Sequence, residues 1–253
     1  ERTLYLGNFT ASMLTYGLFV FIFSRVWAGA YAGRSEIAGY TQSMAVWYFI
    51  VAEITSFGFG RYFWGLSRDV KSGQVAYQLG RPYDFVAYNY AERVGGSLAD
   101  AAVILAEGLA VGFLLVGAPP SAGGGLGAEI LRGGLLAVSL LLAGSLNFLL
   151  HFSISLTAFW LEENDAFYWV YQKLVLVVGT LVPIEFLPDT VAAAALWTPF
   201  PYLSWAPARV FVAFSPADAL SLIARQLAWV VFAVLLARAV FSLSSRRVAL
   251  NGG

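Results

Sequence analysis

The stretch GGLLAVSLLLAGSLNFLLHFSISLTAFWL, residues 133–161, contains no charged residue. A helix needs only ~20 apolar residues to cross the hydrocarbon core of a bilayer, so this stretch is long enough to form a membrane span. The whole chain of 253 residues is 59% hydrophobic and 12% charged, whereas charged residues make up about a quarter of a soluble domain. The sequence therefore predicts an all-α integral membrane protein with several spans, forming a single transmembrane domain over residues 1–253.

Six apolar runs are long enough to be transmembrane helices, and the fourth is longer than a bilayer requires, so we expect it to be tilted, kinked or protruding. Prolines from Pro183 to Pro216 exclude one straight helix between the last two runs. We expect short re-entrant or interfacial helices there. The predicted spans cover about residues 12–30, 40–60, 94–116, 130–160, 167–187 and 220–243.

Basic residues predict the orientation of these spans. Cytoplasmic loops carry an excess of lysine and arginine. The loop between the second and third predicted spans and the C-terminal tail are the most basic segments, with Arg61, Arg68, Lys71, Arg81, Arg93, Arg246 and Arg247. We therefore expect a multi-pass protein of the cell membrane with this loop and both termini in the cytoplasm.

Sequence motifs for catalysis are absent. The chain has no cysteine and no G-x-x-x-x-G-K-[ST], H-E-x-x-H or G-x-S-x-G pattern. We therefore expect no catalytic residue, no metal site and no cofactor in this chain, which would not be an enzyme. We also expect no nucleic-acid partner.

Ionisable residues inside predicted spans are the main candidates for an intramembrane function, because each costs roughly 2.5–3.5 kcal/mol at a helix centre on insertion scales. These are Glu53, Asp100 and Glu107, with His151 and Lys173 as further polar candidates. Asp100 and Glu107 are seven residues apart and share a helix face, and Lys173 could pair with one of them. The alternatives are a structural ion pair, a side chain reaching the interface, and, for His151, a hydrogen bond to a neighbouring helix.

The segment LSRDVKSGQVAYQLGRPYDFVAYNYAERVG, residues 66–95, resembles a cytoplasmic segment of ABC (ATP-binding cassette) type-2 transporter permeases. In that family the pattern I-x-x-D-I-x-x-G-x-L-x-x-x-L-x-R-P follows the second span. The resemblance continues through residues 37–48, 147–164, 179–188, 198–207 and 245–253, and so covers most of the chain. The family commonly has an amphipathic segment before the first span, which the nine residues ERTLYLGNF would represent only in short form.

The resemblance implies a permease subunit that binds a separate cytoplasmic ATPase and works as a pair with an identical or related permease. ATP and Mg²⁺ would then be bound by the ATPase. The loop between spans two and three would form a coupling helix docked on the ATPase; the alternative is an ordinary solvated loop that contacts anionic lipids. The docking residues would be Arg68, Asp69, Lys71, Gly73, Leu79, Arg81, Pro82 and Tyr83.

The segment GTLVPIEFLP is the predicted outer gate, because glycine and proline break a helix where it must bend. The residues concerned are Gly179, Pro183, Glu185 and Pro188. The function expected is ATP-driven export of a substrate, with an amphipathic drug or a lipid compatible with the aromatic-rich spans. The alternative is a proton- or ion-coupled secondary transporter that uses Glu53 and Glu107. A non-transporting anchor or an intramembrane enzyme is less favoured, since no nucleophile–base or metal arrangement occurs.

Overall fold

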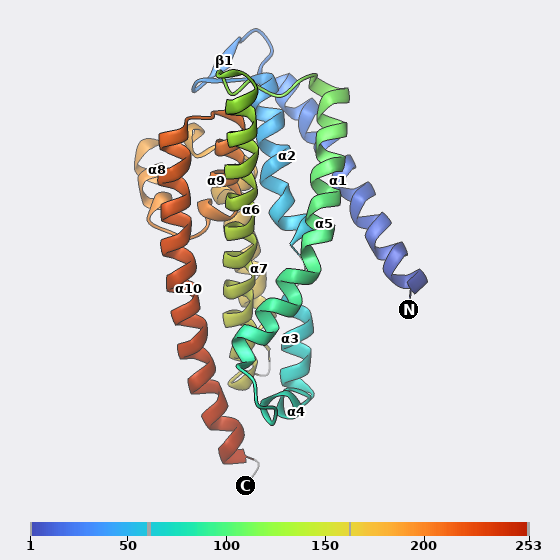
Figure 1. Ribbon diagram of the computed structural model, residues 1–253, viewed down its shortest axis with the longest axis vertical. Coiled ribbons are helices and arrows are strands. Elements are labelled where there is room, and N and C mark those ends of the chain that lie inside the picture. The colour runs from blue at the N-terminus through green and yellow to red at the C-terminus, as the bar shows by residue number, and fades with distance from the viewer. Residues whose placement is uncertain (1, 60–61, 162, 252–253) are drawn as a thin grey trace.

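The computed structural model describes residues 2–59, 62–161 and 163–251, and these are almost entirely helical (Figure 1). The α-helices are α1 (Arg2–Ala30), α2 (Gln42–Gly58), α3 (Tyr62–Lys71), α4 (Val75–Leu79), α5 (Phe85–Val116), α6 (Gly125–Leu156), α7 (Asp165–Val175), α8 (Asp189–Leu196), α9 (Pro201–Val212) and α10 (Pro216–Asn251). A 3-10 turn, Thr157–Phe159, extends α6, and a π-helical turn, Leu176–Thr180, extends α7. A second 3-10 turn, Ile184–Phe186, precedes α8.

Strands β1 (Glu36–Ile37) and β2 (Tyr40–Thr41) form a short antiparallel hairpin between α1 and α2, with Ile37 opposite Tyr40. Ala38 and Gly39 in its two-residue turn both have positive φ, 47° and 81°, as the tightest hairpin turns require. The hairpin was not predicted from the sequence, in which residue 40 starts a membrane span. It delays the helix to Gln42, and the Thr41 side chain caps that helix by accepting from the backbone N–H of Met44 at 3.3 Å.

The long helices run nearly parallel between two ends of the molecule (Figure 1). The β-hairpin and residues 117–124 and 213–215 lie at one end, named here the hairpin end. Helix α4, residues 160–161 and 163–164 and the C-terminal end of α10 lie at the other, named here the α4 end. Helices α2, α6 and α9 pack against one another in the centre, α10 runs along α6, and α1 and α5 lie against α2.

Close helix contacts explain the position of α5. A Cβ atom at Gly108 would clash with Tyr16 of α1 and Ile50 of α2, and one at Gly112 would overlap the Trp47 ring of α2. Small residues at such positions let membrane helices approach closely. Trp47 and Ile50 are fully buried as a result. Glycines thus fix α5 to the α1–α2 pair.

Five helical segments among the described residues are long and apolar enough to cross a membrane. They are Thr10–Ala30, Gln42–Lys71, Phe85–Val116, Gly125–Phe159 and Pro216–Ser244. The third predicted span began at 94, but the helix begins nine residues earlier, because the Asp84 carboxylate accepts from the backbone N–H of Ala87 at 2.8 Å and caps it. At ~1.5 Å per residue α5 is about 48 Å long, well beyond the ~30 Å hydrocarbon core.

The fifth predicted span, about 167–187, is interrupted in its second half, where its glycine and prolines indicated a bend. Helix α7 is 11 residues long, and the π-helical turn after it has non-helical backbone angles at Val178 and Gly179. The chain then turns through α8 and α9, which lie beside α10 in the hairpin-end half of the molecule (Figure 1). The count of six full spans stays a prediction.

Candidate functional site

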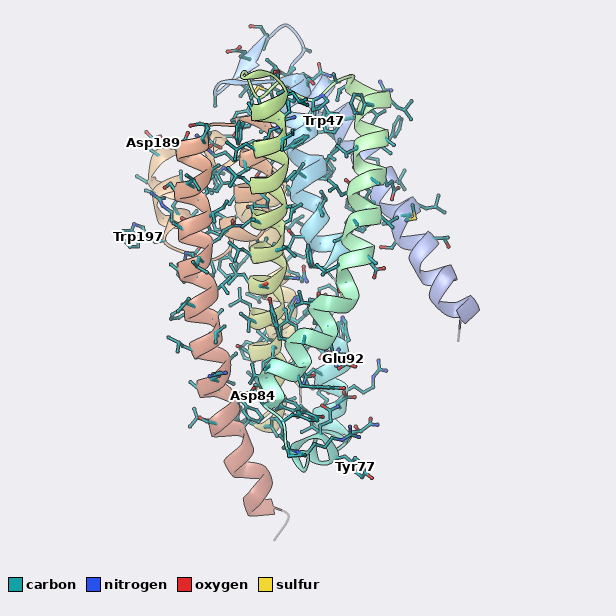
Figure 2. All side chains as sticks on the ribbon, in the orientation of Figure 1. Trp47, Tyr77, Asp84, Glu92, Asp189 and Trp197 are labelled. Carbon is teal, nitrogen blue, oxygen red and sulfur yellow. The ribbon has the colours of Figure 1, made fainter. Side chains whose placement is uncertain are left out.

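Helix α4 and its flanking turns form a charged surface at the α4 end of the molecule. Arg68, Lys71, Gly73, Arg81 and Pro82 are exposed, as a docking surface requires. Gly73 has φ +75°, a left-handed conformation that glycine adopts without strain, and reverses the chain between α3 and α4. These five residues, together with Tyr77, are called the α4 surface below. Tyr77 is 80% exposed and projects from the tip of α4 (Figure 2).

The other three predicted docking residues are held inside this end of the molecule. Asp69 lies 3.9 Å from the guanidinium of Arg93 and so ties α3 to α5. Leu79 is half-buried against the hydrophobic core. The ring of Tyr83 stacks on Tyr88 of α5, with centroids 4.4 Å apart. These residues support the α4 surface.

Contacts at the α4 end connect α3 to α7. The Lys71 ammonium lies 3.7 Å from both Glu163 and Asp165, at the start of α7. One helical turn earlier, the Ser67 hydroxyl donates to the Asn164 side-chain oxygen at 3.0 Å, and Asn164 is fully buried. The Asn164 amide nitrogen in turn donates to the carbonyl of Ile154 in α6 at 3.2 Å. These contacts link the end of α3 to α6 and to the start of α7.

A cavity of about 470 Å³, with polar groups among a mainly apolar lining, lies between α1, α2, α3 and α7. A smaller cavity of about 190 Å³ extends it toward α6 and shares Ser56, Tyr168, Gln172 and Val175 with it. The two together are called the intramembrane cavity. Glu53 of α2 and Lys173 of α7 both line it. Glu53 is only 3% exposed and accepts a hydrogen bond from Ser56, whereas Lys173 is exposed at the rim.

Aromatic rings form one wall of the intramembrane cavity. Tyr168 stacks on Phe63 at 4.7 Å between centroids and contacts the edge of Trp64 at 5.2 Å. Trp169 packs against Tyr168 at 5.4 Å and is half exposed. A carboxylate, an ammonium group, amides and this wall can bind an amphipathic molecule, since aromatic faces accept both apolar groups and cations.

His151 is hydrogen-bonded to a neighbouring helix, one of the two roles considered for it. Its Nε2 lies 3.3 Å from the side-chain nitrogen of Gln172 in α7, while Nδ1 is buried without a hydrogen-bond partner among the described residues. Next to it, the Tyr171 hydroxyl donates to Asn147 at 2.7 Å. His151 thus belongs to the polar lining between α6 and α7.

Asp100 and Glu107 are both half-buried on α5. Lys173 shares its cavity with Glu53 rather than with either of them. One Glu107 oxygen faces Gly17, where a Cβ atom would lie 3.2 Å from it, and the other is buried without a hydrogen-bond partner among the described residues. Glu107 therefore faces α1, outside the intramembrane cavity.

The predicted gate segment contains a helix break. Gly179 has φ +126°, and the Tyr48 hydroxyl of α2 donates to its carbonyl. The same hydroxyl lies 3.4 Å from the carbonyl oxygen of Val182. Thr180 donates to the Ser204 hydroxyl of α9 at 3.0 Å. The break is thus held between α2 and α9.

Glu185 in the gate segment forms an ion pair with Arg209 of α9 and accepts from the Trp205 indole nitrogen at 3.0 Å. Burial, followed by the charge of Glu185, raises the pKa of the nearby Tyr40 phenol in β2, so this hydroxyl stays protonated. Pro183 and Pro188 precede the 3-10 turn and α8, respectively, where no helical N–H is lost. The four predicted gate residues lie within one compact segment.

Several residues at these sites were missed by sequence reasoning. These residues are Tyr77, Asn164, Gln172 and Arg209. Their side chains either contact residues far away in the chain or have no partner among the described residues, so no local sequence pattern marks them. An aromatic residue on a short helix between basic segments was the one available signal, at Tyr77. Within the described residues, no group of three or more His, Cys, Asp or Glu side chains could hold a metal ion.

Helices long and apolar enough to cross a membrane, with a cavity between them, are the features of a multi-pass, all-α membrane protein. A family model described as "ABC-2 family transporter protein" matches residues 9–252. The chain therefore belongs to the ABC-2 family of transporter membrane proteins, as the resemblance predicted. Comparisons with curated proteins and with solved structures each give no match.

Proposed function

We propose that this chain is the permease subunit of an ATP-driven exporter, powered by a separate ATPase that binds ATP and Mg²⁺. The observation that carries the proposal is the α4 surface on a member of the ABC-2 family. Arg68, Lys71, Tyr77 and Arg81 gather at one end of the molecule and are exposed. Arginine and tyrosine are enriched where protein interfaces form, so α4 suits the role of a coupling helix.

The orientation follows from the same surface. Helix α4 and the C-terminal end of α10 lie at the α4 end (Figure 1), and Arg68, Lys71 and Arg81 flank α4 in the chain. By the excess of basic residues we assign this end to the cytoplasm and the hairpin end to the outside of the cell membrane. The break at Gly179 then lies in the outer half, which supports its assignment as the outer gate.

Movement would pass from the ATPase to the gate along α3 and α7. Closure of the ATPases shifts α4 and α3, and the contacts from Lys71 and Ser67 carry this shift to the start of α7. Helix α7 lines the intramembrane cavity and ends at the break. Rocking of α7 would therefore alter the cavity and the gate together, as a rigid element between two hinges does.

The substrate would be an amphipathic molecule that enters the intramembrane cavity. Glu53 lies in this cavity with an aromatic wall beside it, so we favour a molecule with a polar or cationic group and an apolar body. The cavity opens on the side of α1 and α7. A second permease, identical or related, would close this side and complete the path.

Reconstitution tests the proposal. The purified chain alone should hydrolyse no ATP, and from native membranes it should co-purify with an ATPase that contains a P-loop. In vesicles, the complex should move an amphipathic dye only when ATP is supplied. Uptake driven by a proton gradient without ATP would instead support a secondary transporter, and hydrolysis by the isolated chain would contradict a separate ATPase.

A further inference from the structure

A second cavity, of about 630 Å³, lies on the outer surface of the molecule between α8, α9 and α10. It is separate from the intramembrane cavity and shares no residue with it. The residues that line it are mostly small or apolar and aromatic, and one of them is charged. They are Ala193, Leu196, Trp197, Tyr202, Arg225, Ala228 and Trp229. This cavity is called the α8–α10 groove.

Arg225 is the unusual residue of the groove. It lies within the membrane-spanning part of α10, nine residues after Pro216, or about 14 Å along the helix. Its side chain is exposed, and none of the described residues forms a hydrogen bond or an ion pair with it. An arginine inside a membrane normally faces a partner or a water-filled space. Among the described residues nothing occupies this role, so Arg225 is open to a group from outside the chain.

The surroundings of the groove indicate what that group is. Phe232 lies seven residues after Arg225, on the same face of α10, and is 53% exposed, so this face suits contact with lipid chains. Trp197 is 85% exposed and projects from the edge of the molecule (Figure 2), and Trp229 lines the groove one helical turn after Arg225. Tryptophan in such a position is typical of the headgroup level of a bilayer.

We propose that the α8–α10 groove binds one phospholipid, whose phosphate pairs with Arg225 and whose acyl chains lie along Trp197 and Trp229. The planar guanidinium donates two parallel hydrogen bonds to phosphate oxygens, which a lysine cannot reproduce. Ala193 and Ala228 leave the width that an acyl chain needs. The lipid would lie against α8, which connects the gate segment to α9, and so would stabilise that segment from the membrane side.

Native mass spectrometry of the purified full chain in detergent, titrated with phosphatidylglycerol, tests the site. The wild-type chain should bind one phosphatidylglycerol at least fivefold more tightly than Arg225→Gln, and diacylglycerol, which lacks a phosphate, should bind weakly to both. Ala228→Trp, which fills the exposed groove but keeps the arginine, should also weaken binding. Arg25→Gln is the matched control, because Arg25 is an exposed arginine of another membrane helix, close to the hairpin end and away from the groove.

The remaining outcomes decide against the proposal. Equal phosphatidylglycerol binding by the wild-type chain, Arg225→Gln and Ala228→Trp would exclude the groove as a lipid site. Displacement of the lipid by millimolar inorganic phosphate would show a free-anion site in which the acyl chains take no part. Loss of binding in Arg25→Gln to the same extent would mean that general positive charge, and not this groove, holds the lipid.

Discussion

Lys71 at the end of α3 lies 3.7 Å from Asp165 at the start of α7, although 94 positions separate them in the chain. The same ammonium group lies 3.7 Å from Glu163. These contacts join the helix that precedes the α4 surface to the helix that lines the intramembrane cavity. They are the most direct electrostatic link between the two sites.

The substitution Lys71→Glu tests this link. It places a negative charge beside two carboxylates, so α3 and the start of α7 repel each other. Because these side chains are 33–83% exposed, the free energy of unfolding should change by no more than ~1 kcal/mol, measured by thermal denaturation. Transport in vesicles should fall by far more. Adding Glu163→Lys should restore part of it, and failure of this exchange to restore any transport would argue against the link.

The substitution Arg81→Glu tests the α4 surface as a docking site. Breaking a desolvated charged contact costs about 2–5 kcal/mol, while a solvated loop charge costs well under 1. The chain should still insert and fold, but co-purification of the ATPase, its stimulation by substrate, and transport should all decrease together. Arg34→Glu, in the loop before the β-hairpin, is the control and should change none of them. Full retention of the ATPase by Arg81→Glu would mean that this loop is merely solvated.

Cysteine labelling tests the orientation, and the chain has no native cysteine to interfere. A single cysteine at Ser72, beside α4, should react with a membrane-impermeant maleimide only after the cells are opened. One at Ala118, in the loop between α5 and α6, should react in intact cells. Both positions are exposed, and neither is one of the neighbouring glycines with positive φ, Gly73 and Gly117, where a side chain would be strained. The opposite labelling pattern would reverse the assigned orientation.

The substitution Gly179→Ala tests the helix break. With φ +126° a side chain is strained there, and a Cβ atom would lie 3.1 Å from the Cβ of Trp205. We expect a loss of about 1–3 kcal/mol in the free energy of unfolding, measured by thermal denaturation, together with reduced transport. Gly95→Ala in α5 has no atom within 4 Å of its new Cβ and is the control. Equal stability of the two variants would mean that the break tolerates a side chain.

The substitution Glu53→Gln tests the intramembrane cavity. It preserves the shape of the side chain and removes its charge, so a substrate group that pairs with the carboxylate loses ~1.5–3 kcal/mol, or roughly ten- to a hundredfold in affinity. Substrate stimulation of ATP hydrolysis should require a correspondingly higher concentration. Glu36→Gln, outside the spans, serves as the control. Unchanged stimulation in Glu53→Gln would place substrate binding elsewhere.

The sequence predicted the membrane-spanning character of the chain and most of the helices, because apolar runs and prolines act locally. It misplaced the start of α5, since Asn89, Glu92 and Arg93 interrupt the apolar run there, while the Asp84 cap and contacts with α3 hold this stretch in a helix. It indicated a helix break in the segment that starts at Gly179, but the partners in α2 and α9 that hold the break could not be read from the sequence.

The sites were predicted in part. The α4 surface followed a motif, so Arg68, Lys71 and Arg81 were named correctly as exposed residues, although whether they dock an ATPase stays a prediction. The intramembrane cavity could not be derived. Ionisable residues were recognised one by one, but that Glu53 and Lys173 line one cavity and that Glu107 faces α1 depends on how α1, α2, α5 and α7 pack. Hydropathy carries no such information.

The Tyr48 hydroxyl reaches the carbonyls of both Gly179 and Val182. A break in a membrane helix leaves carbonyl groups without their usual donors, and each is costly in an apolar surrounding. One phenol that can exchange between two acceptors keeps at least one of them satisfied while the chain between them shifts. The helix break at Gly179 can therefore change its angle without passing through a conformation in which both carbonyls lack a hydrogen bond. Tyr48→Phe should accordingly slow the motion of this segment more than it destabilises either end state.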